Sequence, residues 1–195
     1  MKAIITSIVL TLLTIVSSGQ SQIKEHLIFK GIAIDGTLNS FVSKLKQSGL
    51  TLKESKESVA ILEGDFAGYK DCIIGVSSLK GKDLVHKVVV FFPYRTTWSA
   101  LSTNYYNLRK LLSEKYGEPT IVTEQFSEKD FALDDNMKML QVQFDNCKYK
   151  AVWSLEKGEI QLLIDHSDSR ECFVTLVYFD NLNSEEIRNN AKGDL

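Results

Sequence analysis

Apolar residues recur at intervals of three and four in two stretches of the chain, residues 37–48 and 97–116. The apolar positions of the first stretch are Leu38, Phe41, Val42 and Leu45, and those of the second are Trp98, Leu101, Tyr105, Leu108 and Leu112. This spacing places them on one face of a helix. Thr37 can cap the first helix, which Gly49 ends, and Gly117 ends the second. The pattern predicts two amphipathic helices.

Runs of β-branched and aromatic residues predict antiparallel strands after both helices. The predicted strands are 26–34, 59–66, 69–77 and 84–92, then 120–126, 140–144, 149–155, 160–164 and 172–179. In the C-terminal strands polar and apolar residues alternate, so one face of the sheet should be covered and the other wetter. Residues 127–136 are acidic and predict a mobile loop. Asn183 is the predicted cap of a last short helix, with Glu186 at the capping-box position.

This order of elements predicts an α+β fold, in which helices pack on one face of antiparallel β-meanders. Residues 26–93 and 97–180 share a plan, because each has a helix that ends in glycine and then antiparallel strands. A tandem repeat of a helix plus four strands is one interpretation. Coincidence is the other, since antiparallel meanders are common. We expect residues 20–195 to form a single compact unit.

Residues 1–19 have the composition of a cleavable secretory signal peptide. Lys2 supplies a positive charge, an apolar run extends to Val16, and three small residues follow. The run is too short to cross a hydrocarbon core of roughly 30 Å as a helix. We expect cleavage after Gly19, although cuts one residue earlier or two later also fit. The mature protein should then be soluble, in a periplasm or secreted. A membrane anchor or a buried N-terminal helix is the competing interpretation.

Composition and charge narrow the classes of partner. Hydrophobic residues make up 44% of the chain and charged residues 25%, which is ordinary for a globular domain. Without residues 1–19, 22 Lys and Arg face 25 Asp and Glu. Nucleic acid and anionic membranes require a basic surface, so a mildly acidic protein is a poor match for either. A protein partner in the cell envelope fits this charge better.

Three cysteines are present, so at least one thiol is unpaired within the chain. Cys72 lies in the middle of a predicted strand and should be a small buried residue. Cys147 and Cys172 belong to the same C-terminal meander and could form a disulfide in an oxidising compartment. Closing that loop is worth about 3 kcal/mol on a chain-entropy model. The sequence leaves open whether the strand order brings the two together.

Three segments stand out in the chain: FKGIAIDGT at 29–37, LEGDFAG at 62–68 and LSEKYGEP at 112–119. With these segments the chain resembles an uncharacterised family of small exported bacterial proteins. The resemblance covers most of the mature chain, and it implies export but no active site. The tandem plan is also similar to the β-lactamase inhibitor protein fold, in which two helix-plus-sheet units form a concave binding face. That likeness is architectural, so no inhibitory residue carries over.

No catalytic, metal or nucleotide motif is complete in the sequence, and no cofactor is predicted. Asp165, His166 and Asp168 form one local cluster with metal-ligand chemistry. A polar hairpin turn, rich in Asp and Ser, is the simpler interpretation. Carboxylates or histidines distant in sequence can still meet in space. A hydrolase-type or metal-dependent enzyme with such a site is therefore the alternative function.

Aromatic residues around the start of the second helix favour binding instead. Trp98 and Tyr105 should face the sheet, whereas Tyr94 and Tyr106 have no evident role in the core. Exposed Tyr and Trp are favoured in binding surfaces, although all four could instead pack between helix and sheet. We predict a non-enzymatic binding protein, with Tyr94, Trp98 and Tyr106 as candidate binding residues. One face of the sheet and the loop after Phe126 would form its working surface.

Overall fold

The computed structural model describes residues 25–79, 81–127, 133–185 and 192. The predicted signal peptide, residues 1–19, lies outside this part of the chain, and so does Glu186. No helix among the described residues is long and apolar enough to cross a membrane.

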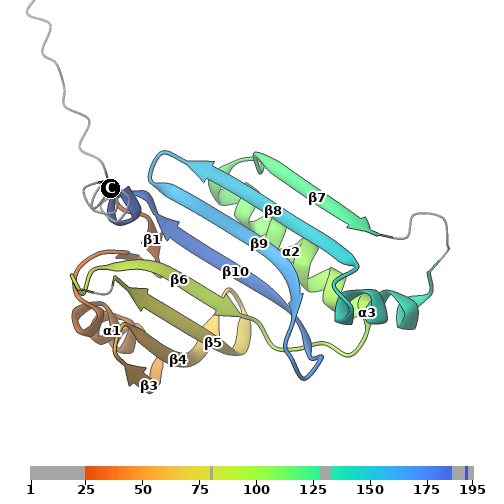
Figure 1. Ribbon diagram of the computed structural model, residues 1–195, viewed down its shortest axis with the longest axis horizontal. Coiled ribbons are helices and arrows are strands. Elements are labelled where there is room, and N and C mark those ends of the chain that lie inside the picture. Colours follow the sequence, from red (N-terminus) through yellow and green to blue (C-terminus); the bar gives the residue numbers. More distant parts are fainter. Residues whose placement is uncertain (1–24, 80, 128–132, 186–191, 193–195) are drawn as a thin grey trace, which may run out of the picture.

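One antiparallel sheet of eight strands dominates the fold (Figure 1). Its strands are β3 (Thr51–Lys56), β4 (Val59–Phe66), β5 (Tyr69–Ser78), β6 (Val85–Phe91), β7 (Ile121–Phe126), β8 (Cys147–Leu155), β9 (Gly158–His166) and β10 (Cys172–Asp180). Their order in the sheet is β3-β4-β5-β6-β10-β9-β8-β7. The sheet is therefore two four-strand meanders, joined where β6 pairs with β10. A separate hairpin of β1 (Ile28–Phe29) and β2 (Ile32–Ala33) precedes them.

Each meander follows a helix, as the sequence predicts. Helix α1 (Leu38–Gln47) begins at Thr37, whose side chain accepts a hydrogen bond from the Ser40 amide. Helix α2 (Trp98–Tyr116) begins at Thr97 and ends at Gly117, which has a φ of 83°. The residues that these helices bury are those predicted from the spacing, with Asn104 in addition. The α+β fold class is confirmed.

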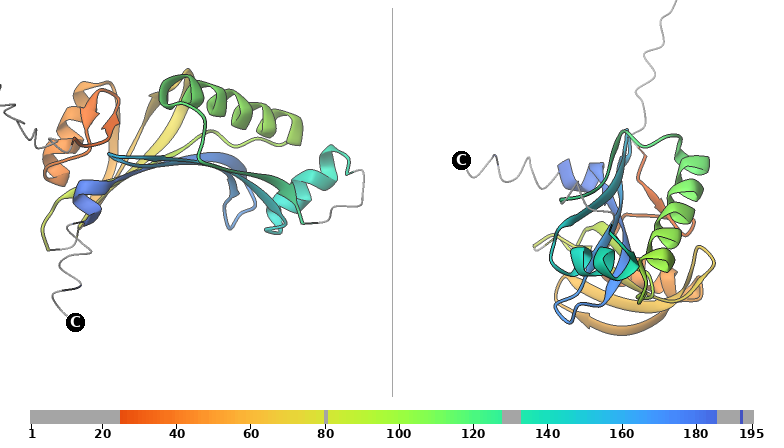
Figure 2. Two further views of the ribbon diagram at one scale, coloured as in Figure 1. Left: turned by 90° about the horizontal axis from the view of Figure 1, so that it is seen from above. Right: turned by 90° about the vertical axis from the view of Figure 1, so that its right-hand side faces the viewer.

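Helices α1 and α2 lie on the same side of the sheet (Figure 2). Apolar side chains from both halves form one core beneath them, including Phe41, Val88, Tyr105, Trp153 and Val174. On the other side, the short helix of residues 181–185 is the one described helix, and it lies at the end of β10 (Figure 2). Most of that side of the sheet therefore carries no helix among the described residues.

The predicted strand at 140–144 is wrong, because this segment belongs to helix α3 (Asp135–Gln143). The alternating apolar residues Leu140 and Phe144 are 41% and 54% exposed, so their alternation does not reflect burial. Met139 and Val142, three residues apart, face the core instead. The predicted loop at 127–136 is wrong at its end, since Asp134 caps this helix and accepts from the Met137 amide.

Three other predictions change in detail. The strand predicted at 26–34 is the small β1–β2 hairpin, which turns through Lys30 and Gly31, both with positive φ. Strand β3 was not predicted, because TLKESK is too polar to read as a strand. Asp180, not Asn183, caps the last helix: its carboxylate accepts from the Asn183 amide at 3.0 Å. The Asn183 side chain instead donates to the Val85 carbonyl at 2.7 Å and to the Ile34 carbonyl at 3.2 Å.

Candidate functional site

The register of the strands defines the face of the sheet that lies opposite α1 and α2. One row across the sheet joins Ile61, Gly75, Val89, Val177, Gln161, Val152 and Ile121, and the next joins Glu63, Ile73, Phe91, Thr175, Leu163, Lys150 and Thr123. The intervening row holds the core residues Leu62, Ile74, Val90, Leu176, Leu162 and Ala151. Because side chains alternate along a strand, the first two rows point away from the core. We call these two rows, with Phe173 and Phe179, the open face.

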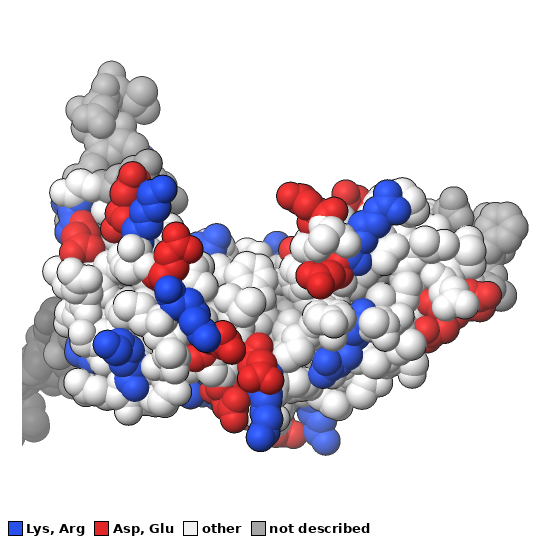
Figure 3. All heavy atoms as spheres, turned by 90° about the horizontal axis from the view of Figure 1, so that it is seen from below, with Lys and Arg blue, Asp and Glu red and all other residues white. Residues whose placement is uncertain are grey.

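The open face is apolar and hollowed at its centre. Figure 3 shows it in profile at the top of the picture, where the outline dips between two raised ends. Thr175 and Val177 form the floor and are only 3% and 7% exposed. Among the described residues, the buried Thr175 hydroxyl has no hydrogen-bond partner. On one flank of the floor, Ile73 is 47% exposed.

Aromatic rings surround the floor of the hollow. The rings of Phe91 and Phe173 meet edge to face, with centroids 5.8 Å apart. The Lys87 ammonium lies 5.1 Å from the centroid of the Phe179 ring. All three rings are partly exposed. Such rings offer rigid contact area at little entropic cost, which is why they are enriched in binding surfaces.

Charged side chains of both signs lie beside this apolar centre, because Lys87 and Glu159 pair with Phe179 and Glu63 pairs with Ile73. Lys53 and Glu63 form an ion pair at 2.8 Å toward the β3 edge. Glu159, whose carboxylate accepts from the Gln161 amide, pairs with Phe179 across β9 and β10. The surroundings of the hollow are thus mixed in charge, as the rim of a protein interface commonly is.

The three predicted aromatic binding residues do not lie on the open face. Trp98 is 8% exposed and packs edge to face against Phe126 and Tyr149, with centroids 4.9 and 5.0 Å away. Tyr106 is 43% exposed and lies on α2 with its ring 6.4 Å from that of Tyr149. Tyr94 is 58% exposed in the connection between β6 and α2. The rings of Trp98 and Tyr106 thus both contact Tyr149. Tyr94 lies elsewhere, in the segment that connects β6 to α2.

A polar group that the sequence analysis missed accompanies these aromatic rings. The Arg109 guanidinium donates to Glu124 at 2.6 Å, and the Tyr106 hydroxyl donates to the same carboxylate at 3.4 Å. Burial raises the pKa of Tyr106 and, more strongly, those of Tyr105 and Tyr149. The i, i+3 spacing of Tyr106 and Arg109 on α2 was the available signal. Glu124, on β7, could not be connected to them without the fold.

The residues of the candidate metal cluster, Asp165, His166 and Asp168, do not converge on one point. His166 directs its Nε2 to Asp145 Oδ1 at 3.3 Å and its Nδ1 to the Ser167 carbonyl at 2.9 Å. The Ser167 carbonyl raises the pKa of His166. Asp165 points to the other side of β9, and Asp168 is exposed in the turn. Among the described residues, no group of three or more His, Cys, Asp or Glu is placed to hold a metal ion.

The three cysteines are free thiols in the structure. Cys72 is fully buried, as predicted, and burial raises its pKa to about 11. Strand β9 lies between the strands that carry Cys147 and Cys172. Two strands apart means about 9–10 Å between main chains, whereas a disulfide requires Cα atoms about 4.4–6.8 Å apart. The Cys147–Cys172 disulfide stays a prediction, and forming it would need the sheet to shift.

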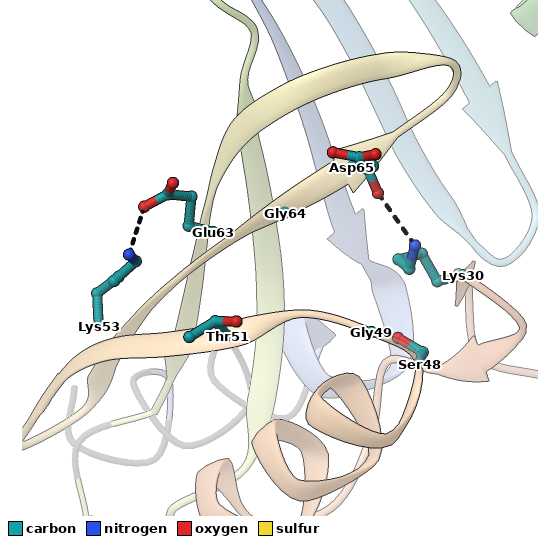
Figure 4. Close-up of a pocket in the computed structure, with 8 residues that line it drawn as sticks. All are labelled: Lys30, Ser48, Gly49, Thr51, Lys53, Glu63, Gly64 and Asp65. Atoms are coloured by element: carbon teal, nitrogen blue, oxygen red, sulfur yellow. Dashed lines mark hydrogen bonds and ion pairs between the residues drawn. The ribbon is translucent and has the colours of Figure 1, made fainter.

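A polar pocket of about 470 Å³ lies at the C-terminal end of α1 (Figure 4). It is lined by Lys30, Ser48, Gly49, Thr51, Lys53, Glu63, Gly64 and Asp65. The Lys30 ammonium donates to the Asp65 carbonyl at 3.2 Å, and Lys53 is paired with Glu63. Both lysines in the pocket therefore already have partners. The open face differs from this pocket in being lined mainly by apolar side chains, among them Ile73, Val89 and Phe91.

Comparison of the chain with known proteins finds no matching family model, no matching curated protein and no matching solved structure.

Proposed function

We propose that this chain is a non-enzymatic binding protein, which holds a protein partner on the open face of its sheet. The observation that carries the proposal is the group of partly or largely exposed apolar side chains across β5, β6, β10 and β9 on the side opposite α1 and α2. These side chains are Ile73, Val89, Phe91, Phe173 and Leu163. Exposed apolar patches with a polar rim mark interaction sites in soluble proteins. The proposal includes export to the periplasm or the medium, which rests on the composition of residues 1–19.

The shape of the open face indicates the kind of partner. A hollow floored by Val177 and Thr175 fits a convex apolar segment better than a flat surface. The partly exposed rings of Phe91, Phe173 and Phe179 would supply the central contact area. The mixed charges around them would orient the partner without strong attraction to nucleic acid or anionic lipid. The enzyme alternative has no observation in its favour among the described residues.

The experiment is a pull-down with mature protein, residues 20–195, from a native cell-envelope extract, read by mass spectrometry. It compares two substitutions of equally exposed apolar residues on opposite sides of the molecule. Ile73→Glu places a carboxylate on the open face, where Ile73 is 47% exposed, and Leu111→Glu places one on α2, where Leu111 is 50% exposed. We expect a saturable partner that Ile73→Glu loses and Leu111→Glu keeps.

Other outcomes would move or remove the proposed surface. No saturable partner, or equal loss with both carboxylate variants, would contradict the proposal. Loss with Tyr94→Ala or Tyr106→Ala, but not with Ile73→Glu, would transfer binding to the aromatic residues that the sequence analysis named as candidates.

A further inference from the structure

The two edges of the eight-stranded sheet differ in how they deter pairing with another chain. At one edge, β3 carries Lys53, Glu54 and Lys56, and its register with β4 shifts between Leu52 and Glu54. Charged residues, lysine above all, and bulges are the devices by which proteins keep an edge strand from recruiting a neighbour. The β3 edge is therefore protected.

The β7 edge has neither a lysine nor a register shift within the strand. The strand IVTEQF contains no Lys, Arg or Pro, and its register with β8 runs from Ile121 to Phe126 without a shift. Ile121 is 57% exposed and Val122 42% exposed. Because the two are neighbours on a strand, β7 is apolar on both faces at this point. An exposed, regular and apolar edge of this kind is a template for strand addition.

Main-chain groups of β7 are turned outward for such pairing. The amide of Ser127, just after β7, donates to the carbonyl of Asn146, just before β8, at 2.7 Å. Hydrogen-bonded residues alternate along an antiparallel ladder, so Val122, Glu124 and Phe126 turn their N–H and C=O groups away from β8. In the part of the chain that the structure describes, no strand pairs with that side.

The strand is also held in its pairing conformation. Phe126 packs against Trp98 and Tyr149. The carboxylate of Glu124, the one charged group in β7, is bound by Arg109 and Tyr106 of α2. The edge therefore carries no free charge, and little conformational entropy is lost when another strand pairs with it.

We propose that β7 pairs antiparallel with β7 of a second copy of this chain, forming a two-fold symmetric dimer with one continuous sheet. Strand addition to an exposed edge is an established mode of recognition. A head-to-tail contact of β7 with β3 would build an open filament, and the charges and bulge of β3 oppose it. The self-complementary β7–β7 contact closes after two copies.

The pleat and the charges restrict the register of this contact. In one continuous sheet both copies place their open faces on the same side. Residues whose main-chain groups turn away from β8 therefore pair with residues of the same kind in the partner. Centring on Glu124 sets two carboxylates opposite each other, which is destabilising. Centring on Thr123 keeps them apart and pairs residues 121–125 of the two copies, with Ile121 opposite the partner's Gln125.

The first test is the mass of the mature protein in solution, measured by light scattering and sedimentation over a range of concentrations. We expect a dimer in reversible equilibrium with the monomer. Val122→Lys, which copies the protection of the β3 edge, should weaken the dimer about tenfold or more. Ile28→Lys is the matched control, because Ile28 is 41% exposed and Val122 42%, and it should leave the dimer unchanged. Unchanged circular dichroism shows that both variants fold.

The second test reads the register. Thr123→Cys places two thiols beside the two-fold axis, at a non-hydrogen-bonded pair whose Cα atoms are about 4.5 Å apart. Mild oxidation should crosslink this variant, but not Gln125→Cys or the unmodified protein. A chain that stays monomeric well above micromolar concentration overturns the proposal. So does a dimer that Val122→Lys leaves intact, or that Thr123→Cys fails to crosslink while a position outside β7 succeeds.

Discussion

At the scale of single residues, Asp180 ties the beginning and the end of the described chain together. Its side chain is fully buried and accepts hydrogen bonds from the amides of Leu27 and Asn183, at 2.8 and 3.0 Å. His26 Nδ1 lies 3.1 Å from the same carboxylate. One side chain therefore satisfies main-chain groups near both ends of the described chain.

Replacing Asp180 with alanine should lower the free energy of unfolding by about 1–3 kcal/mol, because the Leu27 amide would be left buried without a partner. Denaturation in urea, followed by circular dichroism, measures the loss. Asp65→Ala is the control, since the Asp65 side chain is exposed. Its effect should stay within about 0.5 kcal/mol. Equal losses in the two variants would show that the Asp180 contacts add nothing.

Sequence reasoning succeeded at this scale where the physical signal is local. Thr37 was expected as a cap and is one, because its hydroxyl bonds an amide only three residues away. Cys72 was expected to be buried, and it is. Asp180 was not foreseen, because its partner Leu27 lies at the opposite end of the chain. Asn183 was assigned the capping role because the helix was expected to begin after it, whereas the helix begins at residue 181 and Asp180 caps it.

At the scale of elements, the β8–β9 hairpin depends on close approach at Gly158. A Cβ at this position would lie 2.1 Å from the Phe179 carbonyl oxygen and 2.6 Å from Leu27 Cδ1. The main-chain φ of 156° is also rare for residues with a side chain. The turn can form against β10 only because this residue has no side chain.

We expect Gly158→Ala to cost about 2–5 kcal/mol of stability, from overpacking and main-chain strain together. Gly75→Ala is the control within the same sheet, because its nearest neighbour would be Ile61 Cδ1 at 3.9 Å. That change should alter stability by less than about 1 kcal/mol. Thermal unfolding of the two variants distinguishes them, and a mild effect of Gly158→Ala would mean that the hairpin moves to make room.

The placement of β9 between β8 and β10 makes a second prediction. Protein prepared without reductant and then denatured should show three reactive thiols with Ellman's reagent. In the native protein at neutral pH the reaction should be slow, because burial raises the pKa of Cys147 to about 12 and that of Cys72 to about 11. Finding one thiol in place of three would mean that Cys147 and Cys172 do pair.

Elements were predictable where pattern and burial coincide. The two long helices and the apolar central strands have both, so their bounds were found within a few residues. Strand β3 is polar because it is an edge. In the segment of α3, apolar residues alternate at 140, 142 and 144, but of these only Val142 is buried. The open face could be expected only as an unspecified sheet face, since its rows join residues from seven strands. The aromatic candidates were chosen instead from one segment, and they lie outside the rows that form the open face.

At the scale of the whole molecule, one core runs through both halves. The rings of Phe29 in β1 and Tyr178 in β10 meet at 5.4 Å, and the cluster of buried residues includes Phe41 of α1 and Trp153 of β8. We therefore expect the halves to unfold as one cooperative unit, despite their similar plans.

Both tryptophans, Trp98 and Trp153, belong to the second half, so their fluorescence can test this expectation. Phe41→Ala, in the first half, should destabilise the protein by about 3–5 kcal/mol and shift the tryptophan unfolding midpoint to lower urea. Circular dichroism should give the same midpoint. A tryptophan transition that stays in place, while the circular dichroism splits into two steps, would show that the halves are independent.

The pairing of β6 with β10 also constrains the order in which the chain can fold. Val89 of β6 pairs with Val177 of β10. Strand β6 therefore has no partner on that side until nearly the whole second half has been synthesised. Until then β6, the most apolar strand of the first half, is an unpaired edge. Contacts this distant in sequence slow folding and prolong the exposure of such edges to aggregation. A chain stalled or cut before Cys172 would keep that edge open, and we expect its fate to depend on chaperones more than on its own stability.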